Sequence, residues 1–210
     1  SVISAPGLNI SKPADLRGKK VGLPGLFGAN FIGLEALLFA GGVDPSEVTM
    51  DAIGFNQVEA FATGTSDIVV GYAANEPIVL ASQGVELNEL RVADYAQLTA
   101  NGIVTSEKTI TNEPDLVRGM ARALAKGIAD TIANPEEAYT ISLKFVENLK
   151  DQDKTVQMQV LNTSIEFWKA DRIGFSDPQA WENMNDLLVK MELIPDPIDL
   201  SKAFTNEFVP

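Results

Sequence analysis

The 210-residue sequence contains no histidine and no cysteine. Their absence removes thiolate nucleophiles, Ser-His and Cys-His pairs, the usual zinc ligands and the side chain best suited to proton transfer near neutral pH. No stretch has the spacing of a known metal-binding or phosphate-binding loop. The sequence therefore argues against most classes of enzyme, and we expect no catalytic residues, no metal site and no cofactor.

Positive charge is also scarce, because 16 Lys and Arg face 29 Asp and Glu and give a net charge of -13. Such a chain repels phosphate backbones and anionic membrane surfaces, so we expect no nucleic-acid partner. No apolar run reaches the roughly 20 residues that a membrane span requires. The opening stretch SVISAPGLNI has neither the charged nor the apolar region of a signal peptide. In an exported chain, processing would have removed such a peptide.

What the sequence does contain is a regular alternation between Lys19 and Leu98. Short apolar runs alternate with amphipathic stretches, and most are closed by glycine: KKVGLPG, FIGLEALLFAGG, VTMDAIG, NQVEAFATG, DIVVGYAA, EPIVLASQG and LRVADY. This order predicts strands connected by helices, hence a parallel sheet covered on both faces. In the second helical stretch, Asn56 is expected to cap the helix and Glu59 to complete a capping box.

After residue 110 the pattern becomes helical. Four helices are predicted at 114–133, 135–149, 154–170 and 178–191, each entered through Asn, Asp or Pro. Two of them carry apolar stripes, formed by Val117, Met120, Ala121, Leu124 and Ile128 and by Trp181, Met184, Leu187 and Leu188. The stripes could cover one another in a bundle or cover a sheet that this sequence mostly lacks, and we favour the sheet.

Three loops that follow predicted strands carry the candidate binding residues. The loops span 24–30, 54–57 and 71–76, and the carboxyl ends of parallel strands meet at one edge of a sheet, beside helix N-termini. We call this edge the rim. The candidate ligand-binding residues there are Phe27, Gly28, Asn30, Phe55, Asn56, Gln57, Tyr72, Asn75 and Glu76. Aromatic rings, amides and one carboxylate suit a small, flat, uncharged or mildly basic ligand.

Each of these residues also has a purely structural interpretation. Phe27 and Phe55 could belong to the core, the three asparagines could cap helices, and Glu76 could simply favour the dipole at a helix start. Their occurrence at three successive strand ends favours the binding interpretation.

Several stretches resemble one family over essentially the whole chain. They are SKPADLRGKKVGLPG, AGGVDPSEVTMDAIGFNQVEAFATGTSDIVVGY, NEP and KAFTNEF, and they resemble the SsuA/THI5-like group of type II periplasmic substrate-binding proteins. The resemblance implies an α/β fold of two lobes with the solute held in a cleft between them. Residues 1–18 would then be a crossing segment and 19–98 the second lobe. Residues 99–210 would hold the return crossing and the helical C-terminal part of a first lobe whose N-terminal part lies outside this sequence.

The resemblance also implies a function. Such a protein captures a solute for the permease subunits of an ABC importer and works in the periplasm or at the outer face of the cell membrane. The stretch Tyr-x-x-Asn-Glu-Pro resembles the branches that bind thiamine pyrimidine precursors or riboflavin, and the choice between the two stays open. Anionic solutes such as sulfonate or nitrate are disfavoured, because the three loops contain no Arg or Lys.

Two alternatives share the fold. One is a thiamine-pyrimidine biosynthesis enzyme, which by the same resemblance depends on histidine and a cysteine-rich motif that are absent here. The other is a ligand-sensing domain without a role in transport.

Overall fold

The computed structural model describes all residues from Ser1 to Pro210, which form two compact units, Ser1–Gln97 and Leu98–Pro210.

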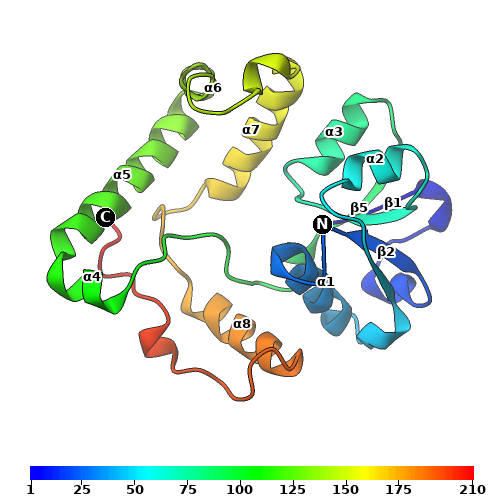
Figure 1. Cartoon of the computed structure of the whole chain (residues 1–210), viewed down its shortest axis with the longest axis horizontal. Helices are drawn as coiled ribbons and strands as arrows, with labels where there is room; N and C mark the ends of the chain where they lie inside the picture. Colours follow the sequence, from blue (N-terminus) through cyan, green and yellow to red (C-terminus); the bar gives the residue numbers. More distant parts are fainter. The chain divides into compact units, whose positions relative to one another are not determined.

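Unit 1 is a five-stranded sheet with helices on both faces (Figure 1). Its strands are β1 (Val2–Ser4), β2 (Lys20–Leu23), β3 (Thr49–Ala52), β4 (Ile68–Val70) and β5 (Asn88–Leu90). Its α-helices are α1 (Gly28–Ala40), α2 (Gln57–Ala62) and α3 (Glu76–Ser82). Short 3-10 helices connect them: η1 (Pro6–Leu8), η2 (Pro13–Leu16), η3 (Pro45–Glu47) and η4 (Val92–Asp94). The strand predicted at LRVADY lies slightly earlier, because η4 occupies most of that stretch.

The sheet has the order β3-β2-β4-β1-β5, and one strand departs from the predicted parallel arrangement. β2 pairs in parallel with β3 and with β4, as expected. β1, however, lies antiparallel between β4 and β5, with Ile3 opposite Val69 on one side and Glu89 on the other. The strands predicted within 19–98 therefore share one direction, and what the sequence did not show is that β1 inserts among them antiparallel. Burial explains why β1 is central, since all three of its residues are buried.

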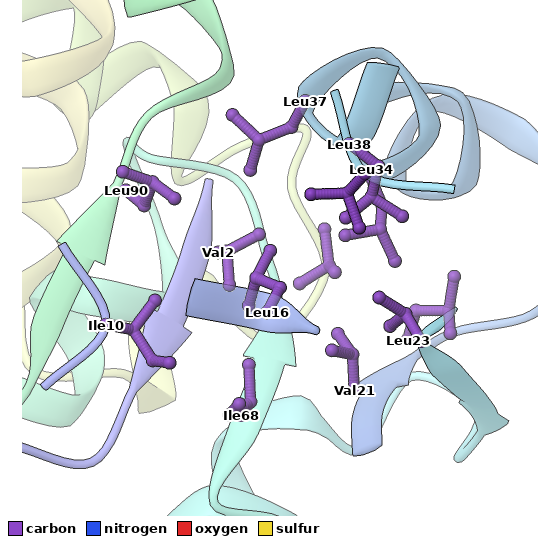
Figure 2. Close-up of a cluster of buried hydrophobic side chains, with 13 residues drawn as sticks. Val2, Ile10, Leu16, Val21, Leu23, Leu34, Leu37, Leu38, Ile68 and Leu90 are labelled. Atoms are coloured by element: carbon purple, nitrogen blue, oxygen red, sulfur yellow. The ribbon is translucent and has the colours of Figure 1, made fainter. Parts of the chain in front are cut away.

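Alternate residues of the strands face two separate apolar clusters. Val2 of β1 joins the larger cluster, which α1 covers with Leu34, Leu37 and Leu38 (Figure 2). Ile3, the next residue, joins the smaller cluster on the opposite face. That cluster also contains Phe61, Val69 and Leu80, contributed by α2, β4 and α3. The helices thus lie on both faces and hold their N-terminal ends at the same edge of the sheet.

Residues 1–18 are part of unit 1 rather than a segment outside it. Besides β1, they contribute Ile10 and Leu16 to the larger cluster. β1 and β5 lie side by side, so the first strand of the unit and its last strand are neighbours. Two features stay predictions. One is that the chain crosses to another lobe at both ends of this unit, and the other is that residues 95–105 run beside the segment before Lys19.

Unit 2 is helical, as predicted, and three of its four expected helices match closely (Figure 1). They are α5 (Pro114–Ala133), α7 (Lys154–Trp168) and α8 (Pro178–Lys190). The helix expected at 135–149 is shorter, because α6 ends at Ser142 (Pro135–Ser142) and η5 (Leu149–Asp151) follows. Two further elements were not predicted: α4 (Glu107–Asn112), which Ser106 caps, and the short η6 (Leu200–Lys202) near the C-terminus.

The two apolar stripes of unit 2 differ in how far this chain covers them, since Leu187 of α8 is buried. α5 has no buried residue, and Leu124 is 47% exposed. Trp181 of α8 stacks on Phe204 with ring centroids 4.9 Å apart, but both clusters of buried apolar side chains lie in unit 1. The stripe of α5 is therefore the less covered of the two. Coverage of these stripes by a sheet from outside this sequence stays a prediction.

Candidate ligand-binding site

The three predicted loops meet at one edge of the sheet of unit 1. β2, β3 and β4 run parallel and end at Leu23, Ala52 and Val70. The loops that leave these ends lead into α1, α2 and α3. The rim expected from the sequence therefore exists within a single folded unit.

The main-chain carbonyl of Val70 ties two of these loops together. The Asn30 side chain donates a hydrogen bond to it from Nδ2 at 3.0 Å, and the buried Gln57 side chain donates from Nε2 at 3.4 Å. Asn30 comes from the first turn of α1 and Gln57 from the first residue of α2. Both amides are thus brought to the end of β4, which is the strand that leads to Glu76.

Glu76 is buried at the first position of α3. Its Oε2 accepts a hydrogen bond of 2.7 Å from the backbone N–H of Tyr72, so the carboxylate closes the loop between β4 and α3. Gly71 permits this closure, because a Cβ at that position would lie 2.8 Å from Glu76 Oε2. No lysine or arginine forms an ion pair with Glu76. The nearby cation is instead the ammonium group of Ser1, which donates a hydrogen bond to the carbonyl of Gly71 and interacts electrostatically with Glu76.

The aromatic residues of the rim lie on the surface rather than in the core. Phe27 is 67% exposed, Phe55 83% and Tyr72 52%. Exposure of this size excludes the core interpretation for Phe27 and Phe55. Gly28, the first residue of α1, has a φ of +71°, a backbone conformation that glycine adopts without strain.

The asparagines of the rim do not cap their helices. Asn56 and Asn75 occupy the N-cap positions of α2 and α3, but neither side chain makes a capping hydrogen bond. The Asn56 side chain instead donates to the carbonyl of Ile53 at 3.2 Å. The predicted capping box of Asn56 and Glu59 is therefore wrong, because the Asn56 amide turns toward the loop before the helix.

A groove of about 540 Å³ runs along part of the rim and between α2 and α3. Five predicted residues line it: Phe55, Asn56, Gln57, Asn75 and Glu76. Phe27, Gly28, Asn30 and Tyr72 do not line this groove, although Asn30 reaches the same Val70 carbonyl as Gln57.

Further lining residues were not predicted from the sequence. They are Val58, Glu59, Ala62, Thr63 and Gln83. Glu59 and Thr63 are four residues apart, so they share a face of α2, and this spacing was the available signal. With Glu59 and Glu76 present and no basic residue, the groove is acidic.

No group of three or more acidic side chains is arranged to hold a metal ion. None of the helices is both long enough and apolar enough to cross a membrane. What the rim offers is three exposed aromatic rings, several amides and the carboxylate of Glu76, which are the groups that can bind a planar polar solute.

Comparison with solved structures defines the class of fold. The chain aligns along 98% of its length with the periplasmic aliphatic sulphonate binding protein SsuA from Escherichia coli, with a TM-score of 0.72. The sequence identity is 16%, and 64% of the SsuA chain is covered. The chain therefore has the α/β fold of this type of periplasmic binding protein, as the resemblance implied.

Residues 1–138 match the family described as NMT1/THI5 like, and the chain belongs to this family. It is 43% identical over 201 residues to the riboflavin-binding protein RibY of Chloroflexus aurantiacus, covering 93% of this chain and 57% of RibY. It is 25% identical over 214 residues to 4-amino-5-hydroxymethyl-2-methylpyrimidine phosphate synthase of Legionella pneumophila, covering all of this chain and 65% of the synthase. The chain thus spans less than two thirds of the length of these relatives.

Proposed function

We propose that this chain belongs to the solute-binding component of an ABC importer and that its rim binds a flat nitrogen heteroaromatic vitamin or vitamin precursor. The observation that carries the proposal is the exposure of Phe27, Phe55 and Tyr72 at the strand ends that also hold Glu76. Exposed rings stack on planar ligands, and a carboxylate accepts hydrogen bonds from the N–H groups of a ring edge.

Riboflavin and a thiamine pyrimidine precursor are the two solutes that fit. Riboflavin is to be tested first, because the relative named as a riboflavin-binding protein is 43% identical to this chain. The acidic groove, without lysine or arginine, supports a neutral or weakly basic solute over a sulfonate or nitrate.

Calorimetric titration of the full-length protein tests the proposal. We expect saturable binding of riboflavin or of 4-amino-5-hydroxymethyl-2-methylpyrimidine, and no binding of an alkanesulfonate. Thermal melts provide a second readout, since a ligand at a hundred times its dissociation constant stabilises the folded state by about 2.7 kcal/mol. Binding of the sulfonate alone would contradict the proposal.

The proposed role requires permease subunits as partners and a location in the periplasm or at the outer face of the cell membrane. Co-purification of the full-length protein with its permease from the host membrane would test the partner. A protein that binds the solute but associates with no permease would support the ligand-sensing alternative.

A second candidate function is pyrimidine synthesis, because the Legionella synthase shares 25% identity with the chain. By the family resemblance, such enzymes depend on histidine and a cysteine-rich motif, and these 210 residues contain neither residue type. Assaying the full-length protein for pyrimidine phosphate formation separates this candidate from a binding protein.

A further inference from the structure

Three amide side chains of the rim are oriented by main-chain carbonyls. Asn30 and Gln57 donate to the carbonyl of Val70, and Asn56 donates to that of Ile53. A carbonyl oxygen can only accept, so each amide must turn its NH2 group toward the main chain. The hydrogen-bond network thus fixes which end of each amide is N and which is O.

This orientation leaves the amide oxygens available. Neither Asn30 nor Gln57 has a further hydrogen bond, and neither has an oxygen that is both buried and unpaired. Their amide oxygens are therefore not sealed off from the rim, although Gln57 is buried as a whole. Each can accept hydrogen bonds, while one of the two N–H groups of each amide is already used.

The surrounding groups add further acceptors. Glu76 uses Oε2 for the backbone of Tyr72, and a carboxylate has acceptor sites beyond that one bond. Glu59 also lines the groove, and no lysine or arginine does. The side chains that line the groove therefore carry negative charge without a basic residue, and the oriented amides of Asn56 and Gln57 add acceptors to them.

We propose that the rim is donor-selective: it binds the solute through N–H or O–H groups of the solute and rejects an analogue that presents an acceptor or a methyl group in their place. This inference rests on the proposed function and specifies which edge of the heteroaromatic solute the rim recognises. Selectivity arises because an acceptor facing an acceptor leaves both desolvated without a hydrogen bond. Asn30 and Gln57 are specificity-determining residues, and the Val70 carbonyl positions their amides.

Two matched pairs of ligands test this selectivity in the full-length protein. The first is riboflavin and 3-methylriboflavin, in which a methyl group replaces the imide hydrogen. The second is 4-amino-5-hydroxymethyl-2-methylpyrimidine and its 4-oxo analogue, in which a carbonyl replaces the amino donor. For whichever parent binds, we expect the analogue to bind at least about tenfold more weakly, a difference of about 1.4 kcal/mol. Affinities within about twofold of each other would overturn the proposal.

Two variants distinguish the loss of a hydrogen-bond donor from a steric effect of the methyl or oxo group. Asn30→Leu removes an amide acceptor, and Glu76→Gln replaces the carboxylate with an amide of the same shape. The ratio between parent and analogue should shrink in at least one of them, because the acceptor that met the lost donor has been removed or weakened. A ratio unchanged in both variants would be steric and would overturn the proposal.

The orientation of the amides is tested without any ligand by Gln57→Glu. At pH 7 the introduced carboxylate has no hydrogen to donate to the Val70 carbonyl, so the melting temperature should fall by about 2–4 °C or more. The deficit should shrink at acid pH, where the introduced carboxyl group is protonated and donates its O–H. Gln83→Glu, at an exposed position of the same groove, adds the same charge and should show neither effect.

The outcomes distinguish the two proposals. If neither parent compound binds, the proposed function fails, and the Gln57→Glu melts alone decide whether the amides have the proposed orientation. If a parent binds and its analogue binds equally well, the proposed function stands and the donor-selective rim fails.

Discussion

Glu76 Oε2 lies 2.7 Å from the backbone nitrogen of Tyr72 and accepts its hydrogen bond, so a buried carboxylate holds the loop between β4 and α3 in place. The helix start favours the negative charge of Glu76, since the first turn of a helix presents unpaired N–H groups. The structural role and the proposed binding role therefore coexist in one side chain. The carboxylate closes the loop with one hydrogen bond and keeps further acceptor capacity for a ligand.

Glu76→Gln and Glu76→Ala separate these two roles. Gln retains an amide oxygen that can accept from Tyr72, so stability should hardly change, while ligand binding should weaken by about 1.5–3 kcal/mol through loss of the charge. Ala removes the acceptor and leaves the Tyr72 N–H without its partner, which should cost about 1–3 kcal/mol of stability. Calorimetric titration and thermal melts of both variants provide the measurements. Equal ligand affinity of Glu76→Gln and the wild type would reduce Glu76 to a structural residue.

Gly71→Ala tests the close approach between β4 and Glu76. The added Cβ would lie 2.8–2.9 Å from three atoms of the Glu76 side chain, which must shift. We expect a loss of about 1–3 kcal/mol of stability, as for overpacking of a dense site, together with weaker ligand binding. Gly7→Ala is the control, because its Cβ would meet no atom within 4 Å and should leave the melting temperature nearly unchanged. Similar melting temperatures for the two variants would show that Glu76 moves freely.

The sequence predicted most of the elements of the fold but not the direction of every strand. The stretch FIGLEALLFAGG was sufficient to predict α1, whose Leu34, Leu37 and Leu38 are all buried in one cluster. Local patterns cannot show that β1 inserts antiparallel between β4 and β5, because strand order depends on contacts far apart in the sequence. The end of α6 at Ser142 was likewise missed, since no proline or glycine marks it.

The location of the rim was predictable, but the orientation of its side chains was not. Parallel strands must bring their carboxyl ends to one edge, which places Glu76 near Gln57 from the sequence alone. That the amide of Gln57 turns to the Val70 carbonyl depends on the spacing of β4 and α2 in three dimensions. Asn56 failed as a predicted cap for the same reason, because the Ile53 carbonyl offers its amide a nearer acceptor.

Glu35 should make stability depend on pH. Its carboxyl is buried on α1, and burial, with a smaller contribution from Asp44, raises the pKa above its ordinary value of 4.5. A raised pKa means that the folded state binds the proton more tightly than the unfolded state, so this stabilising contribution is complete well below pH 4.5 and is lost as the pH rises through the folded-state pKa.

Glu35→Gln removes this titration. We expect the variant to melt at a higher temperature than the wild type at pH 7 and the difference to shrink toward acid pH. Glu86→Gln, at an exposed position, serves as the charge-matched control and should show no such trend. A constant difference between Glu35→Gln and the wild type across the pH range would contradict the prediction.

Replacement of Leu37 and of Leu124 by Ala should have different effects on stability. Leu37 is fully buried in the larger cluster, so Leu37→Ala should cost about 2–5 kcal/mol. Leu124 is 47% exposed, so Leu124→Ala in the 210-residue chain should cost less than about 0.5 kcal/mol. In a longer protein whose added residues cover α5 with a sheet, the cost at Leu124 should rise to about 2 kcal/mol or more. Thermal melts of Leu124→Ala in the 210-residue chain and in the longer protein measure this difference. A stability cost that stays small in the longer protein would argue against the covering sheet.

Phe55 and Phe145 provide a matched pair for the proposed binding site. Phe55 lies on the rim and is 83% exposed, while Phe145 lies in unit 2 and is 81% exposed. Neither side chain is part of an apolar cluster, so replacement of either by Ala should change the melting temperature little. Phe55→Ala removes a ring on which the solute would stack, and riboflavin affinity should fall by about 1 kcal/mol or more, since aromatic pairs contribute about 0.5–1.5 kcal/mol beyond their buried area. Phe145→Ala should leave the affinity unchanged. Calorimetric titration of both variants measures the difference, and an equal effect of the two replacements would mean that the rim aromatics do not hold the ligand.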